Sequence, residues 1–171
     1  PTLRWLWEWA EHSGHAIYIE LPGPDGRVTS TAGKFDVEWC DPVGKRHAAV
    51  IQLYLSTIDQ AYVGPGVMRA DGFIPLEGLT KEERYVEVFG HELAHAHHIL
   101  TDLKLVSSIE NTINRTNALL LSHNASQGGR ELGFEMKWRL YQRDLLLAKL
   151  EAYAEGVEVA IWRELTSSKK K

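Results

Sequence analysis

Residues 80–100 constrain the fold more than any other part of this 171-residue chain. Thr80 is followed three residues later by Glu83, a capping-box pattern, and the sequence after it predicts a helix over residues 81–100. On this helix, His91 and His95 are four positions apart and therefore project from the same face. The fold must place that face where both imidazole rings can meet a common partner.

Residues 91–95 read His-Glu-Leu-Ala-His, a spacing that is typical of a zinc site. Neutral imidazole is a good zinc ligand, and two of them one helical turn apart can bind the same ion. Glu92 follows the first histidine directly, where its carboxylate can accept a proton from water beside the metal. We therefore predict that His91 and His95 bind Zn²⁺ and that Glu92 is a general base.

Catalytic zinc sites usually have three protein ligands and one open position, so a further ligand is needed. The segment 144–161 is apolar almost throughout, with polar positions at 144, 151, 155 and 158. Burying an unpaired carboxylate is costly, whereas a carboxylate that binds zinc or a ligand histidine is compensated. We predict that Glu151 is the third ligand and that Glu155 supports a ligand histidine.

Other interpretations of these residues remain open. Glu151 and Glu155 are also compatible with a solvated acidic stripe on a surface helix. His98 lies at helical spacing from both histidines and is an alternative third ligand. Glu131 and Glu135 are further candidates for that position, although neither stands in a matching motif.

The combination of HELAH on one helix and EAYAE on a later one resembles the gluzincin metallopeptidases, whose third zinc ligand is a glutamate. The resemblance covers these two short motifs and the order of sheet, active-site helix and second helix. It implies that Glu151 is the ligand. Glu155 falls where that superfamily usually has an aspartate that hydrogen-bonds the first histidine. The metzincin pattern is absent, because His98 and Thr101 stand where that family has glycine and histidine.

The fold class expected from these segments is α+β and zincin-like, in a single domain over residues 1–171. Residues 15–56 contain short β-rich runs separated by turns, which predict a small antiparallel sheet. Helices are predicted over residues 1–14, 81–100 and 132–165, so the C-terminal half is mostly helical.

The strand predicted over residues 47–56 comes just before the active-site helix. In zincins, a strand at this position lies at the sheet edge and binds extended substrate by strand addition, and an ordinary core strand is the alternative here. The Gly- and Pro-containing residues 61–78 are predicted to form a loop.

The predicted activity is hydrolysis of peptide bonds in a peptide or protein substrate by metal-activated water. Stabilisation of the developing oxyanion needs a donor, for which His123, Tyr141 and Tyr153 are candidates. One alternative is a protease of narrow specificity, regulatory or toxin-like, because His95-Ala96-His97-His98 loosely resembles the HExxHAxH motif of some bacterial effector and toxin metallopeptidases. Another is a non-catalytic zinc-stabilised binding module.

Composition excludes two classes of partner from these expectations. The net charge is -4, which argues against electrostatic binding of nucleic acid. No segment approaches the ~20 apolar residues that a membrane span needs. The single cysteine, Cys40, excludes an internal disulfide and leaves localisation open between cytoplasmic and secreted. Oligomeric state is not indicated by the sequence.

Overall fold

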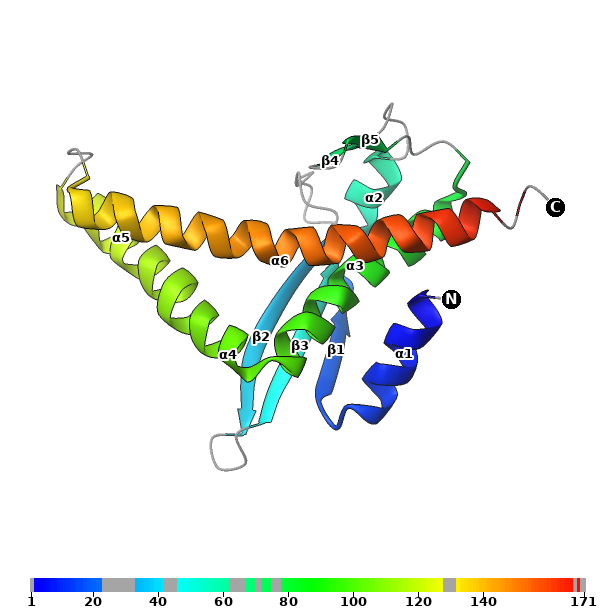
Figure 1. The fold of residues 1–171 in the computed structure, drawn as a ribbon, viewed down its shortest axis with the longest axis horizontal. Helices are drawn as coiled ribbons and strands as arrows, with labels where there is room; N and C mark the ends of the chain where they lie inside the picture. Colours follow the sequence, from blue (N-terminus) through cyan, green and yellow to red (C-terminus); the bar gives the residue numbers. More distant parts are fainter. Residues whose placement is uncertain are drawn as a thin grey trace. The chain divides into compact units, whose positions relative to one another are not determined.

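The computed structural model describes residues 2–22, 33–41, 46–61, 67–69, 72–74, 78–127, 132–167 and 169. The chain is α+β, with a small three-stranded sheet and a mostly helical C-terminal half (Figure 1). The helices and strands are, in chain order, α1 (Thr2–His12), β1 (Ala16–Glu20), β2 (Gly33–Asp41), β3 (Arg46–Leu53), α2 (Leu55–Ala61), β4 (Val67–Arg69), β5 (Gly72–Ile74), α3 (Lys81–Thr101), α4 (Leu103–Ser108), the π-helix η1 (Ile109–Asn114), α5 (Arg115–Gln127) and α6 (Phe134–Ser167).

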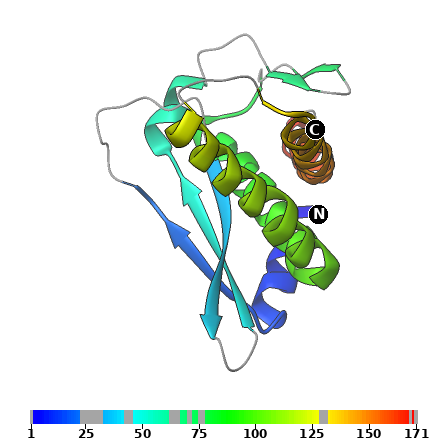
Figure 2. The ribbon, with the colours of Figure 1, turned by 90° about the vertical axis from the view of Figure 1, so that its left-hand side faces the viewer.

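The sheet is mixed, which corrects the prediction of an antiparallel sheet. Its strand order is β1-β3-β2, with β1 parallel and β2 antiparallel to β3 (Figure 2). Of the two interpretations of residues 47–56, the core strand is confirmed and the edge strand is not, because β3 is the central strand. The physical reason is visible in the run Ala48–Ile51, where every side chain is buried. A continuous apolar run is typical of a strand covered on both faces, not of an exposed edge.

The segment that follows β3 contains more structure than the predicted loop. The strand ends at Leu53, and Tyr54 O accepts hydrogen bonds from the backbone N–H groups of Thr57 and Ile58, both at 3.0 Å, which begins α2. Farther on, β4 and β5 form an antiparallel pair within the residues predicted to be a loop. Pairing between two three-residue segments is hard to recognise in a sequence, because such short runs show no clear alternation.

Helix α3 confirms the helix predicted over residues 81–100 and its cap. The backbone N–H of Thr80 donates to Glu83 Oε2 at 2.6 Å, and the N–H of Glu83 donates to Thr80 Oγ1 at 3.3 Å. The first turn is also tied to α2, since Lys81 Nζ lies 2.8 Å from Asp59 Oδ2. Helix α6 likewise confirms the long helix predicted over residues 132–165.

The chain divides into two compact units. Unit 1 comprises Pro1–His97 and Tyr153–Lys171, and it contains the sheet, α1, nearly all of α3 and the C-terminal part of α6. Unit 2 comprises His98–Ala152, with α4, η1, α5 and the first part of α6. The single domain over residues 1–171 remains a prediction.

The core of unit 1 forms around β3 and around the contact of α3 with α6. Buried apolar side chains from these elements include Ile51, Leu93, Ala94, Ala96, Ala154, Val159 and Ile161. Helix α1 is tied to the end of α6, because Thr2 N and Thr2 Oγ1 donate to Glu164 Oε1 at 2.7 and 2.8 Å. Together these contacts place one face of α3 against α6.

Candidate metal centre

His91, His95 and Glu151 form a group that could hold a metal ion. Each offers one ligand atom, and these three atoms all lie within 4.8 Å of one another. The two histidines come from α3 and the glutamate from α6. His95 is 7% exposed, whereas Glu151 is exposed to solvent. The group therefore combines a buried ligand on α3 with a solvent-exposed one on α6.

The separation of the two imidazole rings is suited to one shared ion. His91 Nε2 and His95 Nε2 are 3.2 Å apart. Two nitrogens that bind the same tetrahedral zinc at about 2.0–2.1 Å are expected to be separated by about 3.3–3.4 Å. The rings are nearly perpendicular, at 77°, so they converge edge-on rather than stacking. This donor set of two imidazoles and one carboxylate fits zinc well.

Glu158 orients the first histidine. Its Oε2 lies 2.7 Å from His91 Nδ1, and its side chain is only 4% exposed. An ionised carboxylate only accepts hydrogen bonds, so Glu158 in that form accepts from Nδ1–H of His91 and leaves the lone pair of Nε2 for a ligand. The sequence analysis assigned support of a ligand histidine to Glu155, one turn earlier in α6. The structure places Glu158 at His91 Nδ1, and the role of Glu155 stays a prediction.

Two further buried charged side chains extend this arrangement along α3. Arg84 Nη1 forms an ion pair with Glu87 Oε2 and lies 3.7 Å from Glu158 Oε1. Arg84 and Glu87 are 5% and 1% exposed. Burial raises the pKa of Glu87 to about 7, and the nearby negative charge of Glu158 adds to this, while Arg84 opposes it. The positive charge of Arg84 thus lies close to the carboxylates of both Glu87 and Glu158.

A glycine allows α6 to approach α3 at this point. A Cβ atom at Gly90 would overlap Ile161 Cδ1 and would lie 3.5 Å from Leu3 Cδ1. Ile161 is 1% exposed and therefore has no free space into which to move. With no side chain at residue 90, Ile161 of α6 packs directly against this part of α3.

A second glycine makes room for Glu92. A Cβ atom at Gly33, the first residue of β2, would lie 2.7 Å from Glu92 Cγ. Glu92 is 6% exposed, so its carboxylate is held in a protein environment next to the strand backbone. In the sheet, Gly33 pairs with Leu53 at the end of β3. The first residue of β2 therefore lies beside Glu92.

The candidate oxyanion donors lie in different surroundings. The Tyr153 hydroxyl is 2.8 Å from His97 Nδ1, and burial raises the pKa of this hydroxyl above its ordinary value of 10. His97 also contacts the rings of Trp5 and Trp9, with centroids 4.6 and 4.9 Å away. His123 is half-buried on α5. The oxyanion role of His123 and Tyr153 stays a prediction.

The remaining candidate ligands and oxyanion donors named from the sequence are not part of the group of potential ligands found among the described residues. His98 is half-buried near the end of α3, and the group found among the described residues does not include it. Glu135 pairs with Arg139 at 2.9 Å on the surface of α6. Tyr141 contacts the Trp138 ring at 5.6 Å. Glu131 lies outside the described residues.

Sequence reasoning overlooked Glu158, Arg84 and Glu87, although a signal was present. Glu158 is four residues after Ala154 and three before Ile161, both fully buried, so it occupies the middle of the buried face of α6. Arg84 and Glu87 precede His91 by seven and four positions, which places them on the face of α3 that carries the histidine. Charged residues on buried helix faces indicate a partner or a function.

Comparisons of this chain with known protein families, with curated proteins and with solved structures find no match. Within the described part of the chain, none of the helices has the length and apolar character needed to cross a membrane. The function is therefore inferred from the geometry of the candidate metal centre.

Proposed function

We propose that this chain is a zinc-dependent peptidase in which His91, His95 and Glu151 bind the metal and Glu92 is the general base. The observation that carries the proposal is that the Nε2 atoms of His91 and His95 lie 3.2 Å apart. On the opposite side of the His91 ring, Nδ1 is hydrogen-bonded to Glu158. When bound, zinc would supply Lewis acidity, which makes a nearby water a better nucleophile and polarises a carbonyl group. The resemblance to gluzincins supports the same assignment.

Glu92 would accept a proton from the attacking water and pass it to the leaving nitrogen, so that the amide bond is hydrolysed without a covalent intermediate. Its burial and its position directly after His91 support this role. Such a base must be held in place, and Gly33 provides the room for the carboxylate beside β2. A site that only stabilised the fold would gain nothing from a base at this position.

The position of β2 supports a peptide substrate. Among the described strands, β2 lies at one edge of the three-stranded sheet and is hydrogen-bonded to β3. An extended peptide that adds to a free strand edge is held by regular main-chain hydrogen bonds. Because β2 begins at Gly33, next to Glu92, a peptide bound there would pass close to the proposed base.

The first test measures zinc and peptide cleavage in the same set of variants. Elemental analysis after dialysis should find about one zinc per chain in the wild type and in Glu92→Gln. Cleavage of a proteome-derived peptide library, followed by mass spectrometry, should fall by roughly 10²–10⁴-fold in Glu92→Gln. Glu82→Gln, an exposed residue in the first turn of the same helix, is the matched control and should cleave normally.

Glu151→Ala should lose zinc, and Glu155→Gln shows whether the neighbouring glutamate contributes to metal binding. A wild type that binds no zinc would remove the basis of the proposal. Zinc binding with no cleavage of any library peptide would instead favour a non-catalytic zinc-stabilised module. Cleavage of only a few related peptides would identify a protease of narrow specificity.

A further inference from the structure

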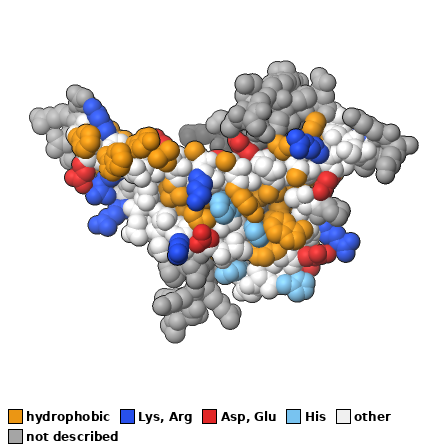
Figure 3. All heavy atoms as spheres, in the orientation of Figure 1, with side chains coloured by type: hydrophobic (Ala, Val, Ile, Leu, Met, Phe, Trp, Pro, Cys, Tyr) orange, Lys and Arg blue, Asp and Glu red, His pale blue; other side chains and the backbone are white. Residues whose placement is uncertain are grey.

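The first part of α6, in unit 2, has an apolar face that is exposed. Phe134, Trp138, Tyr141 and Leu145 are 85%, 53%, 53% and 49% exposed. They are followed on the same face by exposed Ala148 and Ala152, which gives successive spacings of four, three, four, three and four residues. Figure 3 shows hydrophobic side chains along this part of the molecule. This is the spacing at which helices pack against one another in coiled coils and bundles.

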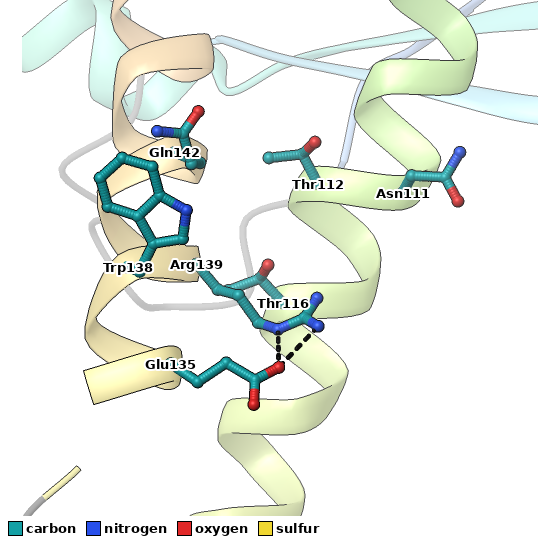
Figure 4. Close-up of a pocket in the computed structure, with 7 residues that line it drawn as sticks. All are labelled: Asn111, Thr112, Thr116, Glu135, Trp138, Arg139 and Gln142. Carbon is teal, nitrogen blue, oxygen red and sulfur yellow. Dashed lines mark hydrogen bonds and ion pairs between the residues drawn. The ribbon is translucent and has the colours of Figure 1, made fainter. Parts of the chain in front are cut away.

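Unit 2 has little core of its own to hold these helices. Of the described side chains on α5, only Thr116 is buried, and none is buried on α6 before Leu150. A hollow of about 330 Å³ lies between η1, α5 and α6, and polar side chains make up most of its lining. Figure 4 shows Arg139 reaching across it toward Thr116 while it pairs with Glu135. Helices of this length depend mainly on a packed apolar face for stability.

The charges beside the apolar face fit a second copy of the same chain. If two α6 helices pack antiparallel, with Trp138 opposite the partner's Tyr141 and Leu145 opposite the partner's Phe134, then Lys137 lies next to the partner's Asp144. Two-fold symmetry produces this pair of opposite charges twice. Asp144 now pairs with Arg143 at 2.7 Å but is 61% exposed, and surface pairs of this kind exchange partners easily.

We propose that the chain forms a homodimer through the apolar face of α6 defined by Phe134, Trp138, Tyr141 and Leu145, with the two copies antiparallel. The dimer brings two α5–α6 hairpins together and covers side chains that water would otherwise contact. It is independent of the metal centre, because none of these four residues belongs to the group of potential ligands.

The experiment is sedimentation velocity on the full chain over a concentration series. The wild type should sediment with twice its chain mass of 19.3 kDa. Leu145→Glu should be monomeric, because it places a charge on the apolar face opposite the partner's Phe134. Lys137→Asp and Asp144→Lys should each raise the dimer Kd by at least about tenfold, since each puts like charges side by side. Circular dichroism checks that every variant remains helical.

The double variant Lys137→Asp with Asp144→Lys separates the possible arrangements. It restores opposite charges in the antiparallel dimer, so its Kd should return to within about threefold of the wild type. In a parallel dimer, the introduced lysine would meet the partner's Lys149, and affinity would not return. Lys104→Asp, on the exposed side of α4, is the charge-matched control and should dimerise normally. A wild type that is monomeric at all concentrations, a dimer that survives Leu145→Glu, or a double variant that is not restored would overturn the proposal.

Discussion

In unit 1, the charged side chains of Arg84, Glu87 and Glu158 are no more than 5% exposed, whereas in unit 2 the aromatic side chains of Phe134 and Trp138 are 85% and 53% exposed. Each unit thus departs from the usual distribution of polar and apolar residues in an opposite direction. Buried charges are tolerated only when they are paired, and exposed apolar faces usually mark a surface that binds a partner.

The difference indicates a division of tasks along α6. Its C-terminal part, in unit 1, supplies Glu158 to a buried ion-pair network that ends on His91. Its N-terminal part, in unit 2, carries the apolar face proposed to dimerise. Under these two proposals, one helix of 34 residues would serve two purposes, and substitutions in its two parts should have different consequences.

The largest effect is expected for Glu158→Ala. Removal of one member of a buried ion pair leaves Arg84 without part of its compensation and should lower the free energy of unfolding by about 3–5 kcal/mol. Zinc affinity should also fall by about 10–100-fold, because His91 loses its orienting partner. Urea unfolding and competition with a chromophoric chelator measure the two effects.

The matched control for this substitution lies in unit 2. Glu135→Ala removes a carboxylate that is 80% exposed and paired with Arg139. Its effect on the unfolding free energy should be within experimental error, because exposed pairs contribute little. Glu158→Gln, which can still accept a hydrogen bond from His91, should retain more zinc affinity than Glu158→Ala. Equal effects of Glu158→Ala and Glu135→Ala would contradict the contrast between the two units.

A smaller and pH-dependent effect is expected at Glu87. Its pKa is raised from 4.5 to about 7, so the folded state binds this proton more tightly than the unfolded chain does. The resulting stabilisation is complete below pH 4.5 and is lost as the pH rises to about 7. Glu87→Gln stays neutral and lacks this pH dependence, so its free energy of unfolding relative to the wild type should rise between pH 5 and pH 8 by up to about 3 kcal/mol. Urea unfolding at pH 5 and pH 8 measures this, and an unchanged pH dependence in the variant would refute it.

The smallest of these effects tests the close approach of α3 and α6. Gly90→Ala should destabilise the chain by about 1–3 kcal/mol, because the new methyl group overlaps the buried Ile161. Gly156→Ala is the control in α6, since a Cβ there meets no atom within 4 Å. It should stabilise the helix by about 0.5–1 kcal/mol. Thermal unfolding of both variants measures the two changes in stability. An unchanged stability of Gly90→Ala would mean that α3 and α6 can move apart at little cost in free energy.

The local parts of the fold were readable from the sequence. The capping box at Thr80 and Glu83 predicted where α3 begins, because its hydrogen bonds involve residues only three positions apart. The pairing of His91 with His95 followed from the helical repeat in the same way. The long apolar segment predicted α6 to within two residues at either end.

The arrangement of the strands was not readable in the same way. The sequence predicted strands near β1, β2 and β3, but it did not show that β1 and β3 are parallel or that β3 is central. Strand order depends on contacts between residues that are far apart in the chain, and a hydrophobic pattern reports only which faces are buried. The supposed substrate strand was therefore assigned to β3, although β2 lies next to Glu92.

The sequence by itself determined the capped helix, the two histidines on one of its faces, Glu92 beside them and a glutamate on a later helix as the candidate third ligand. Only the tertiary structure decided that Glu158 holds His91, that Arg84 and Glu87 form an ion pair behind it, and that Gly90 and Gly33 make room for these contacts. The physical reason is that helix formation and helix faces depend on neighbours within a few residues, whereas hydrogen bonds such as that from residue 91 to residue 158 depend on the way distant helices pack.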